Sequence, residues 1–316
     1  MGKWTHEHMP IAILDLGTNT FCLLIAERSE AGGLHVLHSE ERAVFLGRGG
    51  IEQGRITDEA MDRGLAVLGE LATVARTRGA GDVRGFGTSA LRNARNADRF
   101  IQAARTHHDV GVQVIPGEEE AALILDGVRQ AVTFTGKPML VMDIGGGSIE
   151  FILATDKALM WKRSFELGAT RLLERFHPSD PITLEEHFRI GAYLDAQLEP
   201  LFAVMDRHWP TTLVGSAGAF DTLAALVAEE QGPPLAPGAV TSTFDHAVFD
   251  QLKERLLYTT RAQRAALPAI PDFRVDTLPL GLIAIERVLL HGIEELRWSR
   301  YALKEGAAWR MLGGGR

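Results

Sequence analysis

The sequence contains two similar stretches at an offset of 128 residues, Asp15-Leu16-Gly17-Thr18-Asn19-Thr20 and Asp143-Ile144-Gly145-Gly146-Gly147-Ser148. Each stretch follows a short apolar run and precedes another, and a turn and a third run lie beyond it. Short apolar runs bounded by turn residues predict consecutive antiparallel strands. Two runs that end in Asp-x-Gly could coincide by chance, but the repeated series of strand, loop, strand, turn and strand indicates an internal duplication.

Helical periodicity alternates with these strands along the chain. A helix is predicted after Thr57, strands over residues 82–87 and 110–115, a helix that Asn96 caps, and a helix that begins at Glu118. A strand at residues 212–214 and several further helices are predicted in the second half. Strands interleaved with helices indicate an α/β fold.

The chain has 316 residues, whereas single cores stop growing near about 250–300 residues. We therefore expect two lobes, residues 1–127 and residues 128–316. Hydrophobic residues make up 46% and charged residues 23%, which is typical of a globular protein. The formal net charge of −8 argues against non-specific binding of nucleic acid, so no nucleic-acid partner is expected.

A single cysteine, Cys22, excludes an intramolecular disulfide and a cysteine-rich zinc site. It falls in a predicted strand, where a buried structural thiol is a simpler interpretation than a redox centre. The start of the chain is polar, and Asp15 interrupts the first apolar stretch, which fits neither a signal peptide nor a membrane span. A cytoplasmic protein without a membrane partner is the expectation.

The Asp-x-Gly loops carry three features that phosphate chemistry requires. Glycine lets the backbone approach closely and exposes its N–H groups, and the Thr or Ser hydroxyls that follow can donate further hydrogen bonds. An Asp at the end of a strand is a hard oxygen ligand, suited to Mg²⁺ held partly by substrate phosphates. A hairpin turn with a solvated Asp is the alternative for either loop alone, and two loops at matching positions favour phosphate binding.

Further segments extend this pattern in chain order: Gly87-Thr88-Ser89-Ala90-Leu91-Arg92, Gly117-Glu118-Glu119-Glu120-Ala121, Ile149-Glu150 and Gly215-Ser216-Ala217-Gly218. Together with the two loops they resemble the exopolyphosphatase and guanosine pentaphosphate phosphohydrolase (Ppx/GppA phosphatase) family, which belongs to the actin, sugar-kinase and Hsp70 superfamily. The resemblance covers nearly the whole chain. Two segments depart from the family pattern, since Gly215-Ser216-Ala217-Gly218 lacks an expected Gly-Thr and Lys304-Glu305-Gly306 stands where Arg-Glu-Gly is frequent.

The resemblance implies a fold of two ribonuclease-H-like lobes of the actin-like ATPase type, with an active-site cleft between them. The chain resembles the short two-domain members that lack additional C-terminal helical domains. Such a chain would hold only a few phosphates, and a homodimer could extend the binding surface.

The resemblance also implies which residues bind phosphate: Asp15, Gly17, Thr18 and Asn19 of the first half, Thr88, Ser89 and Arg92, and Gly145, Gly146, Gly147 and Ser148 of the second half. Arg92, expected at a helix start, could grip a phosphate bidentately. Asp143 and Glu150 would hold Mg²⁺, and Glu150 would also assist the attacking water. Because Cys22 occupies the position in the first half that Glu150 occupies in the second, metal chemistry is expected on the second loop.

Three consecutive acidic residues, Glu118, Glu119 and Glu120, open the predicted helix at residue 118. All three could simply complement the helix dipole, and we accept that interpretation for Glu118 and Glu119. Consecutive helical residues point about 100° apart, so only one of the three can face a site well. The family pattern places its catalytic carboxylate immediately before the Ala, which selects Glu120 as the general base.

These features predict a Mg²⁺-dependent hydrolase that releases terminal orthophosphate from inorganic polyphosphate. Guanosine pentaphosphate, converted to the tetraphosphate, is the alternative substrate. A superfamily kinase and a non-catalytic alarmone-binding regulator would keep the same loops, and they stay open as further alternatives.

Overall fold

The computed structural model describes residues 9–30, 32–232 and 234–314. The chain divides into two compact units: unit 1 comprises the described residues up to Gln130 together with those from Tyr301 onward, and unit 2 comprises those of Ala131–Arg300. The predicted second lobe, residues 128–316, differs from unit 2 at its end. The reason is that helix α11 (Leu303–Met311) packs on the strands of unit 1.

Unit 1 is built on a five-stranded sheet of order β3-β2-β1-β4-β5. Its strands are β1 (Ile11–Leu16), β2 (Thr20–Arg28), β3 (Leu34–Ala43), β4 (Asp82–Gly87) and β5 (Gly111–Val114). Strands β1, β2 and β3 pair antiparallel, as the apolar runs predict, whereas β4 pairs parallel to β1 and to β5.

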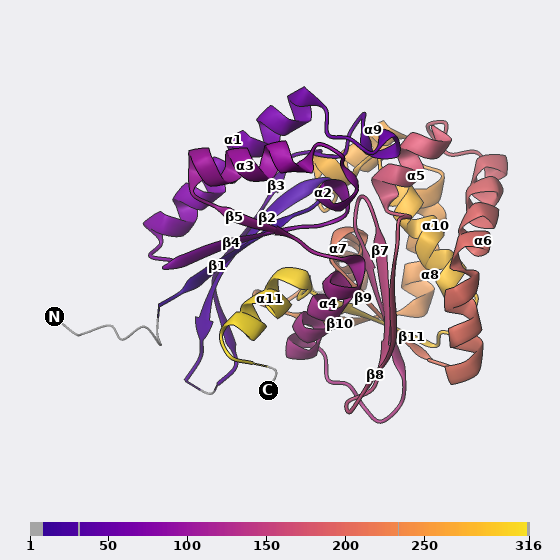
Figure 1. Cartoon of the computed structure of the whole chain (residues 1–316). Coiled ribbons are helices and arrows are strands. Elements are labelled where there is room, and N and C mark those ends of the chain that lie inside the picture. The colour runs from indigo at the N-terminus through magenta and orange to yellow at the C-terminus, as the bar shows by residue number, and fades with distance from the viewer. Residues whose placement is uncertain (1–8, 31, 233, 315–316) are drawn as a thin grey trace. The chain divides into compact units, whose positions relative to one another are not determined.

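Helices cover both faces of the unit 1 sheet (Figure 1). They are α1 (Asp58–Thr77), α2 (Ser89–Asn93), α3 (Ala97–His108), α4 (Gly117–Ala131) and α11, with a short 3-10 helix at Ile51–Gln53. Helices α1 and α3 pack together over a core of alternate strand residues, among them Leu14, Leu16, Phe21 and Leu23. Helix α11 lies against β1 and β2 on the opposite face.

The two predicted helix caps of unit 1 have different outcomes. The Thr57 side chain accepts a hydrogen bond from Ala60 N at 3.2 Å, which confirms the cap of α1. Asn96 does precede α3, but its amide exchanges two hydrogen bonds with the backbone of Ile56, at 2.9 and 2.8 Å. Asn96 thus occupies the predicted N-cap position of α3, but its side chain ties two segments together instead of capping the helix.

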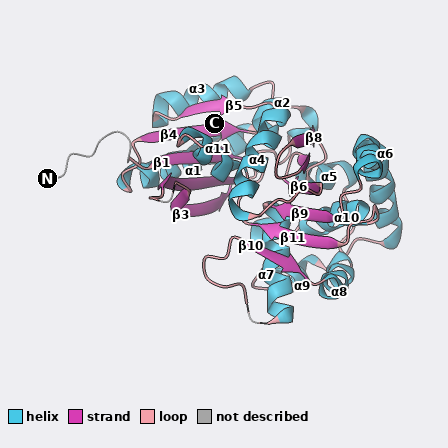
Figure 2. Ribbon diagram, turned by 90° about the horizontal axis from the view of Figure 1, so that it is seen from below, coloured by secondary structure: helices cyan, strands magenta, loops and turns pink. Residues whose placement is uncertain are grey.

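Unit 2 contains a six-stranded sheet of order β10-β11-β9-β6-β7-β8. Its strands are β6 (Met139–Ile144), β7 (Ile149–Ala154), β8 (Leu159–Phe165), β9 (Thr212–Ser216), β10 (Thr241–Phe244) and β11 (Glu295–Ser299). Figure 2 shows β9, β11 and β10 side by side. Strand β6 is buried along its whole length, which explains why five of its six residues are apolar, with Asp143 the exception.

The helices of unit 2 are α5 (Ala169–Phe176), α6 (Leu184–His208), α7 (Gly218–Gln231), α8 (His246–Leu257), α9 (Arg261–Ala265) and α10 (Leu278–Leu289), with a 3-10 helix at Asp272–Arg274. Helix α10 packs against α5, α6 and α8 and supplies much of the apolar core. Within the described residues, no helix has the length and apolarity needed to cross a bilayer.

The two sheets share a connectivity that supports the predicted duplication. In unit 1 the order is β3-β2-β1-β4-β5, and in unit 2 the corresponding order is β8-β7-β6-β9-β11, with β10 added at the edge. Cross-strand partners also correspond, because Asp15 lies opposite Cys22 and Asp143 lies opposite Glu150. Both halves are thus the same α/β arrangement, which agrees with the fold class predicted from the sequence.

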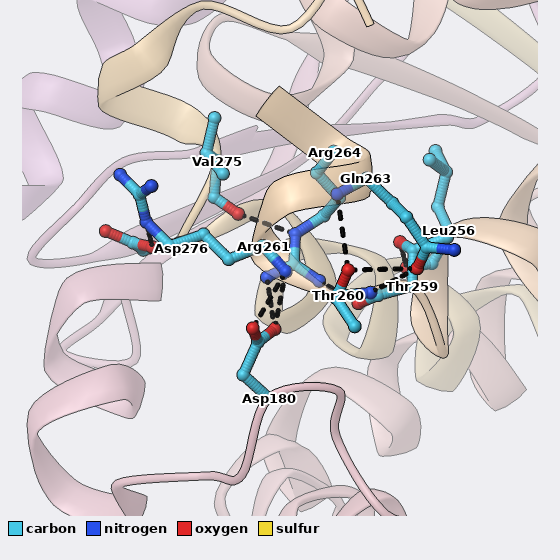
Figure 3. Close-up of polar contacts among 9 residues, drawn as sticks. All are labelled: Asp180, Leu256, Thr259, Thr260, Arg261, Gln263, Arg264, Val275 and Asp276. Carbon is cyan, nitrogen blue, oxygen red and sulfur yellow. Dashed lines mark hydrogen bonds and ion pairs between the residues drawn. The ribbon is translucent and has the colours of Figure 1, made fainter. Parts of the chain in front are cut away.

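A buried arginine fixes the short helix α9 within unit 2 (Figure 3). The Arg264 side chain donates to Val275 O at 2.8 Å, to Thr259 O and to Asp180 at 3.3 Å. The Asp180 carboxylate also accepts from Arg261 N, at 2.7 and 2.9 Å to its two oxygens. Burial lowers the pKa of Arg264, and Asp180 opposes that shift. This network joins the segment before α6, helix α9 and the segment before α10.

Helices α4 and α11 approach each other through two glycines. A Cβ added at Gly306 would lie 1.8 Å from Leu123 O, and one added at Gly127 would lie 1.9 Å from Ala302 O. Arg310 of α11 also pairs with Glu119 and Asp126 of α4. The position of α4, and of every side chain on it, therefore depends on α11.

Replacing Gly306 with Ala should lower the free energy of unfolding by about 2 kcal/mol or more, because backbone must move to admit the methyl group. Helix propensity alone predicts the opposite sign, a gain of about 1 kcal/mol. Urea denaturation of Gly306→Ala measures the difference. Gly136→Ala is the control, since a Cβ there meets nothing within 4 Å. Equal stability of the two variants would contradict the close contact.

Candidate active site

The second loop, residues 145–148, connects β6 to β7 and is closed by a hydrogen bond from Gly145 N to Ser148 O at 3.0 Å. The carbonyl groups of Gly145, Gly146 and Gly147 are engaged by the start of α5. Gly145 O accepts a hydrogen bond from Ala169 N at 3.0 Å. Gly146 O accepts from Thr170 N at 2.9 Å and from Arg171 N at 3.2 Å. Gly147 O accepts from Arg171 Nε at 3.1 Å. The loop therefore rests on α5 through its oxygens.

The carbonyl contacts determine where the loop amides point. In a planar trans peptide the N–H is directed away from the C=O of the same unit. Because the carbonyls of residues 145–147 face α5, the N–H groups of Gly146, Gly147 and Ser148 face away from it. Successive N–H groups turned to one side are suited to bind an anion. Of the four residues predicted to bind phosphate here, Gly146, Gly147 and Ser148 thus turn their N–H groups to one side, whereas the N–H of Gly145 closes the loop.

Two carboxylates lie close to the second loop, separated from it along β6 and β7 by the residue pair Ile144 and Ile149. Asp143 and Glu150 are opposite each other on β6 and β7, so their side chains share a face of the sheet. Asp143 is 7% exposed and Glu150 is 1% exposed. Ser216 Oγ donates to Asp143 Oδ2 at 2.8 Å, and Ser164 Oγ donates to Glu150 Oε1 at 2.6 Å.

Several residues of this region were missed by sequence reasoning. Arg171 binds Gly147 O and also pairs with Glu166 at 2.9 Å, which holds the loop from behind. Gly168 is required for that approach, since a Cβ there would lie 2.4 Å from Gly146. The run Gly168-Ala169-Thr170-Arg171 was the available signal, but its partner loop lies more than twenty residues earlier. Ser164 gave no signal beyond its hydroxyl group, whereas Ser216 lies in the quoted segment Gly215-Ser216-Ala217-Gly218 but was given no role.

The first loop, residues 17–19, is supported in a comparable way. Gly17 N donates to Thr20 O at 3.0 Å, which matches the closure of the second loop. Thr18 O accepts from Gly47 N at 3.1 Å, and Asn19 O accepts from the backbone N–H groups of Val44 and Phe45 at 2.8 and 2.7 Å. The segment after β3 therefore supports the first loop as α5 supports the second. The N–H groups of Asn19 and Thr20, which belong to the same peptide units as these carbonyls, face away from that segment.

Thr88 and Ser89 lie at the turn from β4 to α2, and both are buried. Thr88 N and Thr88 Oγ1 both approach Leu16 O, at 3.4 Å, so this turn is tied to the end of β1. Asn93 Nδ2 donates to Ser89 O at 2.9 Å. The hydrogen bonds of Thr88 thus hold the β4–α2 turn at the end of β1, beside the first loop.

Glu120 and Arg92 are brought together within unit 1. Arg92 Nη1 lies 2.6 Å from Glu120 Oε2 and 3.3 Å from Ile115 O. Glu120 is 6% exposed, whereas Glu118 is exposed and Glu119 pairs with Arg310. Of the three acidic residues, Glu120 is therefore the one that faces inward. Arg92 lies in the last turn of the five-residue helix α2, so the prediction that it stands at a helix start is wrong.

Asp15 ends β1 beside the first loop and faces α11 rather than the α1 and α3 core. Burial raises the pKa of Asp15 from 3.8 to about 6, Lys304 lowers it, and Glu305 and Glu41 raise it further. A carboxyl group held against its preferred charge state costs stability, and such groups concentrate at functional sites.

Asp15→Asn should stabilise the protein at pH 7 by about 1–3 kcal/mol, because the variant has no buried charge to form. The folded-state pKa of Asp15 lies above its unfolded value. The stability of the wild type relative to the variant is therefore greatest below pH 3.8 and is lost as the pH rises through about 6. Denaturation of both proteins from pH 3.5 to 7.5 measures this difference. Asp62→Asn, at an exposed position of α1, is the control. A difference that stays constant with pH would contradict the assignment.

The donors near the second loop fit Mg²⁺ in their chemistry. No group of three or more His, Cys, Asp or Glu side chains that could hold a metal occurs among the residues that the structure describes. Mg²⁺ commonly takes one or two carboxylates and completes its shell with waters and phosphate oxygens. Asp143 and Glu150 supply two adjacent hard carboxylates, each oriented by a serine hydroxyl.

Known proteins resemble this chain over nearly its whole length. The model of the Ppx/GppA phosphatase family matches residues 24–314. Exopolyphosphatase 2 of Mycobacterium tuberculosis is 33% identical over 96% of this chain and 98% of its own length. Exopolyphosphatase 1 of Mycobacterium leprae is 28% identical over 96% of this chain and 90% of its own length.

Solved structures with similar folds cover nearly the whole chain. An exopolyphosphatase from Cytophaga hutchinsonii has a TM-score of 0.94 and 36% sequence identity, and the match covers 97% of this chain and 99% of that protein. A Ppx/GppA family member from Aquifex aeolicus has a TM-score of 0.77 and 25% identity, over 96% and 98% of the two chains. The chain therefore belongs to the Ppx/GppA phosphatase family.

Proposed function

We propose that this protein is a Mg²⁺-dependent exopolyphosphatase, which hydrolyses the terminal phosphoanhydride bond of inorganic polyphosphate. The observation that carries the proposal is that three loop N–H groups, at residues 146–148, and the paired carboxylates Asp143 and Glu150 lie at the same end of strands β6 and β7. Donors and hard anionic ligands at one strand end suit a phosphate that brings its own cation. The names of the relatives support polyphosphate as the substrate.

In the proposed reaction, a water oxygen attacks the terminal phosphorus and the bond from phosphorus to the bridging oxygen breaks. Glu120 takes the proton from the water, and the shortened polyphosphate leaves with the bridging oxygen. Phosphoryl transfer depends mainly on positioning and charge stabilisation, so one well-placed base and several fixed donors suffice. Arg92 and the amides of both loops would stabilise the charge on the phosphate oxygens.

The Asp143 and Glu150 carboxylates would hold the Mg²⁺, and Ser216 and Ser164 would keep them oriented. When bound, Mg²⁺ would neutralise charge on the phosphate oxygens. Glu150 has a second proposed role, which is to orient the attacking water. Cys22 faces Asp15 at the corresponding position of unit 1, and a neutral thiol cannot provide either function.

The substrate is tested by phosphate release from short and long polyphosphates, guanosine pentaphosphate and ATP, with Mg²⁺ present. Release from polyphosphate supports the proposal. Preferential release from guanosine pentaphosphate would replace it with the alternative family activity. Tight nucleotide binding without turnover would indicate a regulator, and transfer of phosphate from ATP to an acceptor would indicate a kinase.

Asp143→Asn should reduce phosphate release by at least about tenfold, since loss of an outer-shell partner alone costs that much at metal sites. Raised Mg²⁺ should restore part of the activity. The thermal stabilisation that Mg²⁺ gives the wild type should also shrink. Asp156→Asn, in the exposed turn between β7 and β8, is the control. If the Mg²⁺ dependence of the two variants is the same, Asp143 is not a ligand.

Glu120→Gln should lower single-turnover phosphate release by about 10²–10⁴-fold, the usual contribution of a general base. The amide keeps the size of the side chain and an acceptor for Arg92, so substrate binding should stay near that of the wild type. Glu118→Gln is the matched control on the exposed side of the same helix turn, and it should change the rate little. Equal losses in both variants would show that the base lies elsewhere, with Glu150 the next residue to test.

A further inference from the structure

Equivalent rows of side chains cross the two sheets at the level of two corresponding acids, Asp143 in unit 2 and Asp15 in unit 1. In unit 2 the register places Ser216, Asp143, Glu150 and Ser164 side by side on four neighbouring strands. Both carboxylates of this row accept a hydrogen bond from the adjacent serine. The row therefore presents two oriented carboxylates, which the proposed function assigns to an exchangeable cation.

In unit 1 the corresponding row is Phe86, Asp15, Cys22 and Glu41. Phenylalanine and cysteine replace the serine and the glutamate that flank Asp143, so neither residue directly opposite Asp15 is a hydroxyl donor or a second carboxylate. The nearest acid of the row is Glu41, one strand further away and exposed. Asp15 thus has the position of a metal ligand without the partners of one.

Helix α11, which packs across β1, carries Lys304 in its first turn. Its Lys304 Nζ lies 3.1 Å from Glu305 Oε1, and the two side chains are 17% and 3% exposed. Glu305 Oε2 in turn accepts from Ala302 N at 2.9 Å, which fixes the first turn of the helix. The close contact at Gly306 holds the same turn against α4. Lys304 is therefore carried on a backbone that has little freedom to move.

We infer that Lys304 is a positioning residue whose ammonium group keeps the Asp15 carboxylate ionised. In unit 2 the proposed function assigns the same role, a positive charge beside the carboxylates of Asp143 and Glu150, to Mg²⁺. The inference rests on the proposed function in one respect, because it takes Asp15 as part of the phosphate-binding site. It assigns a built-in cation to one half of the duplicated fold and an exchangeable cation to the other.

The charge of Asp15 matters because it decides the direction of hydrogen bonds at this strand end. An ionised carboxylate only accepts hydrogen bonds, whereas a protonated one also donates. Three charged groups act on Asp15, and they come from the elements that pack against it: Lys304 and Glu305 from α11, and Glu41 from β3. Only the first favours the ionised form. The pKa of Asp15 is about 6 with Lys304 in place, so removing the ammonium group should raise that pKa further.

The test compares Lys304→Met, Lys304→Arg and the control Lys157→Met, which removes a lysine from the exposed β7–β8 turn. The rate of phosphate release from a short polyphosphate is measured from pH 5 to 9. Lys304→Met should move the acid-side midpoint of the profile upward by about one pH unit, with roughly fivefold lower activity at pH 6 and little loss at pH 9. Lys304→Arg and Lys157→Met should follow the wild type. A loss that is uniform with pH, or no rescue by arginine, would overturn the inference.

A second arm does not depend on activity. The thermal midpoint is measured across the same pH range for Lys304→Met, in the wild-type background and in the Asp15→Asn background. In the wild-type background, the thermal midpoint of Lys304→Met should continue to fall above pH 6, because a higher pKa of Asp15 extends the loss of stability to higher pH. In the second, that continuation should be absent. If it persists without Asp15, the ammonium group acts on Glu41 or Glu305 and the inference is wrong. If the wild type releases no phosphate, the proposed function fails while this arm still decides the pairing of Lys304 with Asp15.

Discussion

A backbone amide can be aimed at a ligand only if the carbonyl of the same peptide unit is satisfied on the opposite side. An unpaired buried carbonyl costs free energy comparable to a lost hydrogen bond. In the second loop this condition is met by α5, whose first N–H groups and Arg171 side chain take up three consecutive carbonyls. The approach of α5 requires the absence of a side chain at Gly168. The orientation of the loop thus depends on helix α5, which begins more than twenty residues later in the sequence.

The first loop meets the same condition with different parts. Its carbonyls are taken up by the segment after β3, and Arg63 of α1 donates to Val44 O and Phe45 O of that segment. Phe45 adopts a positive φ of 53°, a conformation that costs a non-glycine residue about 1–2 kcal/mol. The loop amides thus have the same orientation in both halves, but the segment after β3 supports them in unit 1 and helix α5 supports them in unit 2. Conservation of geometry with exchange of supports is expected where the geometry itself carries the function.

Local patterns in the sequence were sufficient for the strands and loops. The strand, loop and strand series around Asp15 and Asp143 could be predicted because each apolar run and each turn lies within a few residues of the next. The inward position of Glu120 followed from helical geometry together with the family pattern. Contacts between distant segments were not predictable in this way. Asn96 binds a segment forty residues earlier, and α11 returns to unit 1 after the whole of unit 2.

Charged residues show the same division between local and distant determinants. The ion pair of Arg92 with Glu120 joins residues 28 positions apart, and no periodic pattern in the sequence predicts it. Lys304 is visible in the sequence only as a departure from a frequent arginine. Its effect on Asp15 depends on the packing of α11 across β1. Sequence patterns could therefore select the candidate residues, whereas their partners had to come from the fold.

The costs of this arrangement are concentrated at the strand ends. Asp15 is held with a raised pKa, and Ala217, after β9, has a φ of 54° and a ψ of −178° that glycine adopts far more readily. The next residue, Gly218, could not carry a Cβ, which would lie 2.2 Å from Ile144 O at the end of β6. These features persist because the strands behind them are embedded in apolar cores that extend through each unit. Strain that is confined to the ends of rigid strands, beside loops whose amides are turned outward, indicates that the backbone there is shaped for a ligand rather than for stability.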